Sequence, residues 1–80
     1  MIAVGTIVLE MHPDAMLADG LDAALLGCDT KGRAVYSVSK IIQIFMERDG
    51  MDENTAMEYF DYNVEQAYLG EYTPIYLYDA

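Results

Sequence analysis

Basic residues are scarce in this sequence. Its 80 residues include four lysines and arginines against 14 aspartates and glutamates, which gives a formal net charge of −10. A chain with this charge repels the phosphate backbone, so ordinary electrostatic binding to nucleic acid is excluded. The charge favours a cationic protein surface as the partner, or simply high solubility.

Cysteine and long apolar runs are also nearly absent. Cys28 is the single cysteine, so no disulfide can form within the chain, and its apolar surroundings are typical of a buried, inert thiol. A lone cysteine favours a reducing compartment. The apolar residues 1–9 have no basic segment before them and are too short to cross a bilayer. We therefore expect a cytoplasmic protein with no membrane contact.

The sequence contains no glycine-rich phosphate loop and no nucleophile paired with a base. His12 has no second histidine or nearby cysteine with which to share a metal. The best catalytic candidate is Pro13-Asp14 with Asp29-Thr30-Lys31, which resembles the PD…D-x-K pattern of a large nuclease superfamily. In that superfamily the two acids hold a divalent metal and the lysine stabilises charge at the phosphate.

This nuclease pattern is short and degenerate, and residues 29–32 equally predict a tight hairpin turn with glycine at its last position. A nuclease also needs a positive surface to approach phosphates. We therefore expect no enzymatic activity, no metal and no cofactor, and keep a metal-dependent nuclease as a remote alternative.

The hydrophobic pattern predicts a single α+β domain over residues 1–80, with two helices covering a small antiparallel sheet. Strands are expected from β-branched or alternating residues, in an N-terminal strand at 2–9, a hairpin at 23–28 and 33–36, and a C-terminal strand at 75–78. In the last strand, Ile75 and Leu77 are expected to face the core. Ser37 or Ser39 is expected to cap the first helix, which ends near Asp49.

Two helix faces are predicted to be buried. The first helix has a core stripe of Val38, Ile41, Ile42, Phe45 and Met46. The second helix, at residues 52–70, begins with Asp52 as its N-cap. Its core stripe consists of Ala56, Met57, Phe60, Val64, Ala67 and Tyr68.

The opposite face of the second helix is acidic. Asn54, Glu58, Asp61 and Glu65 align at helical spacing beside Tyr62, and residues 49–80 contain eight acids and no base. Like charges at these spacings are mildly destabilising, so the face is either tuned for solubility or serves to meet a basic partner.

Tyrosines add to this acidic region, because six of the seven lie from Tyr59 onward. Aromatic rings together with carboxylates suit the recognition of arginine- and lysine-rich surfaces. The residues predicted to bind a partner are Asp52, Glu53, Glu58, Asp61, Tyr62, Glu65, Glu71 and Tyr72.

Three segments resemble a group of small, acidic, uncharacterised bacteriophage and prophage proteins: Glu47-Arg48-Asp49-Gly50-Met51, Ala56-Met57-Glu58-Tyr59-Phe60-Asp61-Tyr62-Asn63 and Ala67-Tyr68-Leu69-Gly70-Glu71-Tyr72-Thr73-Pro74. The resemblance covers roughly residues 23–78. It implies a small phage protein in the cytoplasm of a host cell, and no defined activity.

Size, charge and this context together are similar to those of anti-CRISPR proteins, some of which present acids where phosphates would lie. We therefore expect a non-catalytic inhibitor of a host defence complex of the CRISPR-Cas kind, which occupies a basic nucleic-acid-binding surface. The alternative is a structural or regulatory phage protein that forms a homodimer, with residues 2–9 pairing as strands between chains.

Overall fold

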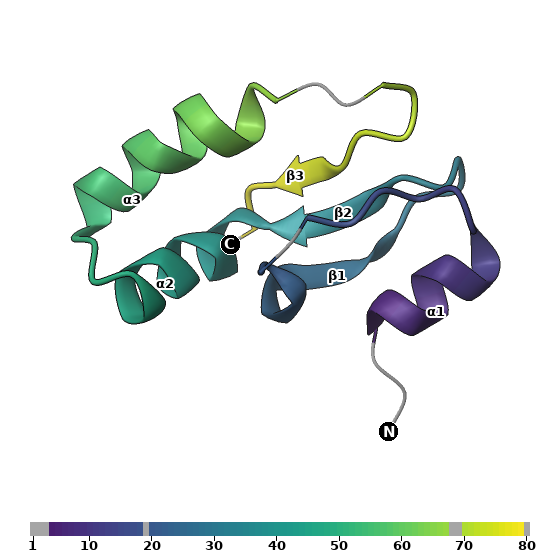
Figure 1. The fold of residues 1–80 in the computed structure, drawn as a ribbon, viewed down its shortest axis with the longest axis horizontal. Coiled ribbons are helices and arrows are strands. Elements are labelled where there is room, and N and C mark those ends of the chain that lie inside the picture. Colours follow the sequence, from purple (N-terminus) through teal and green to yellow (C-terminus); the bar gives the residue numbers. More distant parts are fainter. Residues whose placement is uncertain (1–3, 19, 68–69, 80) are drawn as a thin grey trace.

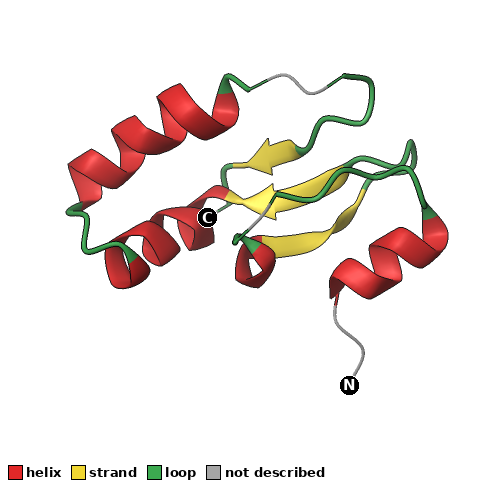
Figure 2. Ribbon diagram, in the orientation of Figure 1, coloured by secondary structure: helices red, strands yellow, loops and turns green. Residues whose placement is uncertain are grey.

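The chain folds into one three-stranded sheet with helices around it (Figure 1, Figure 2). The computed structural model describes residues 4–18, 20–67 and 70–79. In chain order the elements are α1 (Val4–Met11), the 3-10 helix η1 (Asp22–Ala24), β1 (Leu25–Cys28), β2 (Ala34–Ser37), α2 (Val38–Arg48), α3 (Glu53–Tyr59), the π-helix η2 (Phe60–Glu65) and β3 (Ile75–Leu77). The predicted α+β class is confirmed.

The sheet is mixed, whereas a fully antiparallel sheet was predicted. Its strand order is β1-β2-β3; β1 pairs antiparallel with β2, and β3 pairs parallel to β2. Ser37 both ends β2 and precedes α2, so the chain runs directly from strand into helix. Because α3 and η2 then run back along the molecule, β3 begins at the same end of the sheet as β2 (Figure 1).

The β1–β2 hairpin is confirmed, and Asp29 organises its turn. One carboxylate oxygen of Asp29 accepts hydrogen bonds from the backbone N–H groups of Lys31 at 2.9 Å and Arg33 at 2.8 Å. Gly32 has a φ of +90°, and a Cβ on it would lie 3.0 Å from Nδ1 of His12. The turn therefore requires glycine for both its backbone conformation and its closeness to His12.

The two helix starts are also confirmed. The Ser37 side chain accepts a hydrogen bond from the N–H of Lys40 at 3.2 Å, and Asp52 accepts from the N–H of Thr55 at 2.7 Å. Each acceptor satisfies a backbone donor that a helix leaves unpaired in its first turn. Both helices thus begin where a short polar side chain precedes an amphipathic segment.

The N-terminal strand predicted at residues 2–9 is wrong over residues 4–9, because Val4–Met11 form helix α1. Residues 2 and 3 lie outside the described residues. The helix packs on β1 through Val8, which is 1% exposed, while Gly5 lies against the side chains of Leu17 and Leu25. β-branched composition is only a weak preference for strands, and packing overrides it here. No helix in the described residues is long and apolar enough to cross a membrane.

Strand β3 turns toward the core the face that was predicted to point outward. Tyr76, expected on the outer face, packs with its ring 6.0 Å from that of Tyr36 and 5.4 Å from that of Phe60. Leu77, expected in the core, is 46% exposed. The parallel register places Tyr76 beside Tyr36, a buried residue, and Phe60 completes the aromatic cluster. Alternation alone does not say which face of a strand meets the helices.

The second helix is shorter than predicted, since regular helix ends at Glu65 and its last part is π-helical. Ala56 and Phe60 are fully buried and Met57 and Val64 half-buried, as expected, but Ala67 is exposed. Tyr68 lies outside the described residues. The Asn63 side-chain amide donates to the carbonyl of Tyr59 at 3.3 Å, which satisfies an acceptor where the α-helical pattern ends.

Candidate partner-binding surface

The acidic stripe, which we define as Glu58, Asp61 and Glu65, lies on α3 and η2. Glu58 and Glu65 are exposed and Asp61 is half-buried. Tyr62, the aromatic residue predicted beside them, is 73% exposed. The structure thus leaves the predicted acids and their tyrosine accessible to a partner.

The π-helix bends this stripe. A π-helix rotates less per residue than the roughly 100° of an α-helix, so Asp61 and Glu65 turn away from the side of Glu58 and Tyr62. Their charges act on Tyr78, which follows β3 and whose ring meets that of Phe60 edge to face, with ring centroids 6.4 Å apart. Partial desolvation raises the pKa of the Tyr78 hydroxyl, and the charges of Glu65 and Asp61 raise this pKa further.

Few basic residues are available to neutralise these acids. Within the described residues the only ion pair is between Arg48 and Asp49, at 3.0 Å. Arg48 also donates to the carbonyl of Gly20 at 2.8 Å, and Arg33 donates to the carbonyl of Thr73 at 3.1 Å. Two of the four bases are therefore engaged elsewhere, and no base of the described residues is ion-paired with the stripe.

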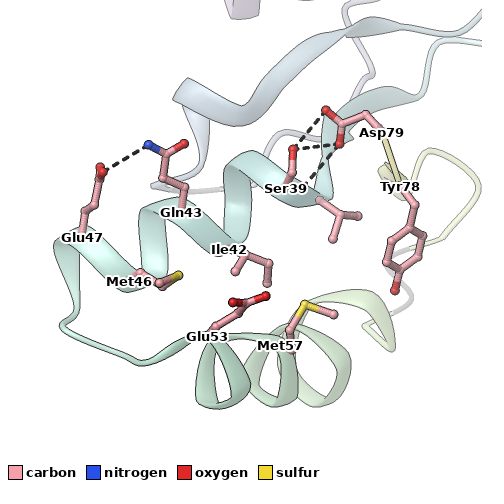
Figure 3. A pocket seen from close by; sticks show the side chains of 10 residues that line it. Ser39, Ile42, Gln43, Met46, Glu47, Glu53, Met57, Tyr78 and Asp79 are labelled. Atoms are coloured by element: carbon pink, nitrogen blue, oxygen red, sulfur yellow. Dashed lines mark hydrogen bonds between the residues drawn. The ribbon is translucent and has the colours of Figure 1, made fainter.

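A groove of about 430 Å³ opens between α2 and α3 beside Tyr78 (Figure 3). In Figure 3 Ile42 and Met46 line the groove from α2 and Met57 lines it from α3, and the side chain of Glu53 lies between the two methionines in this view. Val38 and the ring of Tyr78 complete its apolar lining. Met46 is 39% exposed, which corrects its predicted place in the core stripe: it lies at the margin of that stripe and lines the groove.

Acids surround this groove. Glu47 comes from the end of α2, Glu53 from the first turn of α3, and Asp79 from the residues after β3. Two of these carboxylates are held in place by neighbours. Gln43 donates to Glu47 at 3.1 Å, and the Ser37 and Ser39 hydroxyls donate to Asp79 at 2.8 and 3.0 Å.

The hydrogen bonds to Asp79 have an electrostatic consequence. The bond from the Ser37 hydroxyl, with further bonds from Ser39, lowers the pKa of the Asp79 carboxyl below its ordinary value, although desolvation acts in the opposite direction. Asp79 is therefore a fixed negative charge at the N-terminus of α2, where the helix dipole also favours an anion.

The other predicted binding residues are divided between two places. Asp52 is occupied as the cap of α3, and the hydrogen bond from the Thr55 backbone lowers its pKa. Glu53 lines the groove. Glu71 and Tyr72 precede β3, whereas Tyr78 follows it, so these two residues lie at the other end of that strand from the groove.

Several groove residues were missed by sequence reasoning, above all Met46, Met57, Tyr78 and Asp79. Each has an ordinary explanation in the sequence: two methionines at helical core spacing, and a tyrosine and an acid near the end of the chain. The available signal was the repeated occurrence of methionine at the margins of two successive amphipathic helices, a residue that adaptable binding surfaces often use.

Asp29, one acid of the nuclease-like pattern, has a structural role in the fold. The Asp29 carboxylate is engaged by the hairpin turn, and its pKa is lowered first by the hydrogen bond from the backbone of Arg33. Across residues 4–18, 20–67 and 70–79, no three histidine, cysteine, aspartate or glutamate side chains are grouped so that they could hold a metal ion.

Asp61 and Glu65 of the stripe and the acids of the groove therefore make up an acidic region around Tyr78 with an apolar floor, built by α2, η2, the first part of α3 and the residues after β3. What it binds has to be argued from this chemistry, because no family model, no curated protein and no solved structure matches the chain.

Proposed function

We propose that the protein is a non-catalytic interaction protein that docks this acidic region on a basic surface of a partner protein. The observation that carries the proposal is the grouping of Glu47, Glu53 and Asp79 around the groove, with Asp61 and Glu65 close enough for their charges to act on Tyr78. Carboxylates concentrated in this way, without opposing bases, attract lysine and arginine side chains and hasten encounter with a cationic surface.

The partner class that we propose is a nucleic-acid-binding effector of host defence, of the CRISPR-Cas kind. Glu58 to Glu65 spans about 10 Å of helix axis, with three charges over that length. One nucleic-acid strand carries a charge about every 3.4 Å, so the stripe alone is sparser than a strand. The acids of the groove raise the density, which supports imitation of a strand by the whole region. The resemblance to phage proteins supplies the biological context.

The test is a charge reversal of the stripe: Glu58→Lys, Asp61→Lys and Glu65→Lys together. A matched control reverses Glu10, Asp14 and Asp22, which are exposed acids outside the region. Both variants go from a net charge of −10 to −4, because each substitution changes the charge by two. Circular dichroism establishes that each variant is folded.

The tagged proteins are used to capture partners from lysate of a bacterial host. We expect the wild type and the control to retain a nucleic-acid-binding complex that added nucleic acid displaces, and the stripe variant to lose it. Equal capture by all three would make the stripe a solubility feature. Capture of further copies of the protein alone would favour the self-association alternative, with the exposed Ile7, Leu9 and Met11 of α1 as its contact surface in place of a paired strand.

A further inference from the structure

We propose that the groove between α2 and α3 binds the apolar face of a cationic amphipathic helix of the partner. This inference rests on the proposed function and specifies it, because it names the structural element that the acidic region receives. The groove and the stripe would contribute to affinity separately, so an experiment can refute the role of one and leave the role of the other standing.

The first observation is that the floor of the groove is apolar and accessible to solvent. Met46 lines the groove from α2 and Met57 from α3, and Tyr78, which is 64% exposed, lies at one end (Figure 3). The volume of about 430 Å³ lies within the usual range of ligand sites. Methionine side chains are unbranched and polarizable, so the floor can adapt to the side chains placed on it.

The second observation is the sign of the charge around this floor. Glu47, Glu53 and Asp79 approach from three different segments, and no lysine or arginine among the described residues lines the groove. Gln43 and the two serine hydroxyls hold Glu47 and Asp79 in fixed positions, which reduces the entropy lost when a cation pairs with them. An apolar occupant with lysine or arginine along its flanks is complementary to this arrangement.

The walls of the groove indicate that the occupant is a helix. α2 and α3 bond their backbone groups internally, so they offer side chains and no free ladder of N–H and C=O groups to an extended peptide. A helix needs no such ladder, and it presents apolar residues at positions i, i+3, i+4 and i+7 to a groove. Its basic residues then reach the rim acids, and Asp61 and Glu65, whose charges act on Tyr78, can attract those that project farther.

The experiment uses the whole protein with its methionine methyl groups labelled with ¹³C. The probe is a synthetic amphipathic helix of leucine and lysine of about 14 residues, which is about four turns. A second peptide keeps every lysine and replaces every leucine by serine. Met46 and Met57 report on the groove, whereas Met11 and Met16 lie outside it and serve as internal controls.

We expect the leucine–lysine peptide to shift the methyl signals of Met46 and Met57 and to leave those of Met11 and Met16 in place. It should bind about tenfold tighter than the serine–lysine peptide, because only leucine buries apolar surface on the floor. Met46→Gln should reduce this difference severalfold. Met11→Gln, which changes an exposed methionine on α1, should leave it unchanged.

Three results separate this inference from the proposed function. If both peptides bind equally and the signals of Met46 and Met57 stay in place, the helix-binding groove is refuted while binding to the acids stands. If the leucine–lysine peptide binds through the groove with the same affinity after reversal of Glu58, Asp61 and Glu65, the inference holds and the stripe has no part in binding. If neither peptide binds, the inference is refuted.

Discussion

At the scale of single residues, Asp79 connects the segment after β3 to the start of α2 through hydrogen bonds from Ser37 and Ser39. Protonation of the Asp79 carboxylate should weaken these hydrogen bonds. Its folded-state pKa is lowered by the hydrogen bonds from Ser37 and Ser39. A carboxyl with a lowered folded pKa contributes stability above its unfolded pKa of about 3.9, and this contribution is lost as the pH falls through the folded pKa.

We therefore expect Asp79→Asn to destabilise the protein at neutral pH and to have little effect in strong acid. The measurement is urea unfolding of the wild type and the variant at a series of pH values from about 7 down to about 2, which brackets both ionisation states. The gap between their free energies of unfolding should close as the pH falls below about 4. A gap that stays constant would mean that the carboxylate charge contributes nothing and that only the shape of the side chain matters.

At the scale of elements, substitutions of two glycines test the helical assignment of α1 and the backbone conformation of the connection between α2 and α3. Gly5 lies within α1, and an added Cβ would meet Leu17 and Leu25 at 3.5 and 3.8 Å, which are ordinary contacts. Gly50 has a φ of +70° and open space around it. The same substitution should therefore have opposite signs at the two positions.

Gly5→Ala should stabilise the protein by about 0.5–1 kcal/mol, since alanine is the better helix former. Gly50→Ala should destabilise it by about 1 kcal/mol, because a side chain is strained in the left-handed region. Chemical denaturation of both variants measures the two effects. Destabilisation by Gly5→Ala would contradict the helical assignment of residues 4–11 or their packing on β1.

The hairpin turn and the two helix starts, which the sequence predicted correctly, are set by local hydrogen bonds. Asp29 determines the hairpin turn, Ser37 and Asp52 determine the helix starts, and in each case the partner lies within four residues. Residues 4–11 show the limit, because an apolar segment of eight residues fits a strand or a buried helix, and only its packing on β1 decides.

The candidate site could be predicted from the sequence only in part, because it too depends on how the elements pack. The acids of α3 and their tyrosine follow from helical spacing, but the groove depends on the angle between α2 and α3 and on where β3 returns. Met46 and Met57 become neighbours only through that packing. The turn of Asp61 and Glu65 toward Tyr78 depends on a π-helix, for which the sequence has no recognised signal.

At the scale of the whole molecule, one acidic field acts on both folding and binding, with opposite consequences. A net charge of −10 on a chain of this size repels itself and so opposes the folded state. The same field attracts a basic partner. Salt screens both effects, because the distance over which charges interact falls from about 10 Å at 0.1 M to about 3 Å at 1 M.

We therefore expect added sodium chloride to raise the melting temperature of the free protein while it weakens binding of the serine–lysine peptide. The leucine–lysine peptide should keep part of its affinity at high salt, since the apolar floor of the groove is not screened. The Glu58→Lys, Asp61→Lys, Glu65→Lys variant, with its smaller net charge, should show a weaker rise in melting temperature.

Thermal unfolding and calorimetric titration at 0.1 and 1 M salt measure the two trends. A melting temperature that does not change with salt would show that the acids are already neutralised within the fold, and an affinity that does not change would assign the binding to the apolar floor alone.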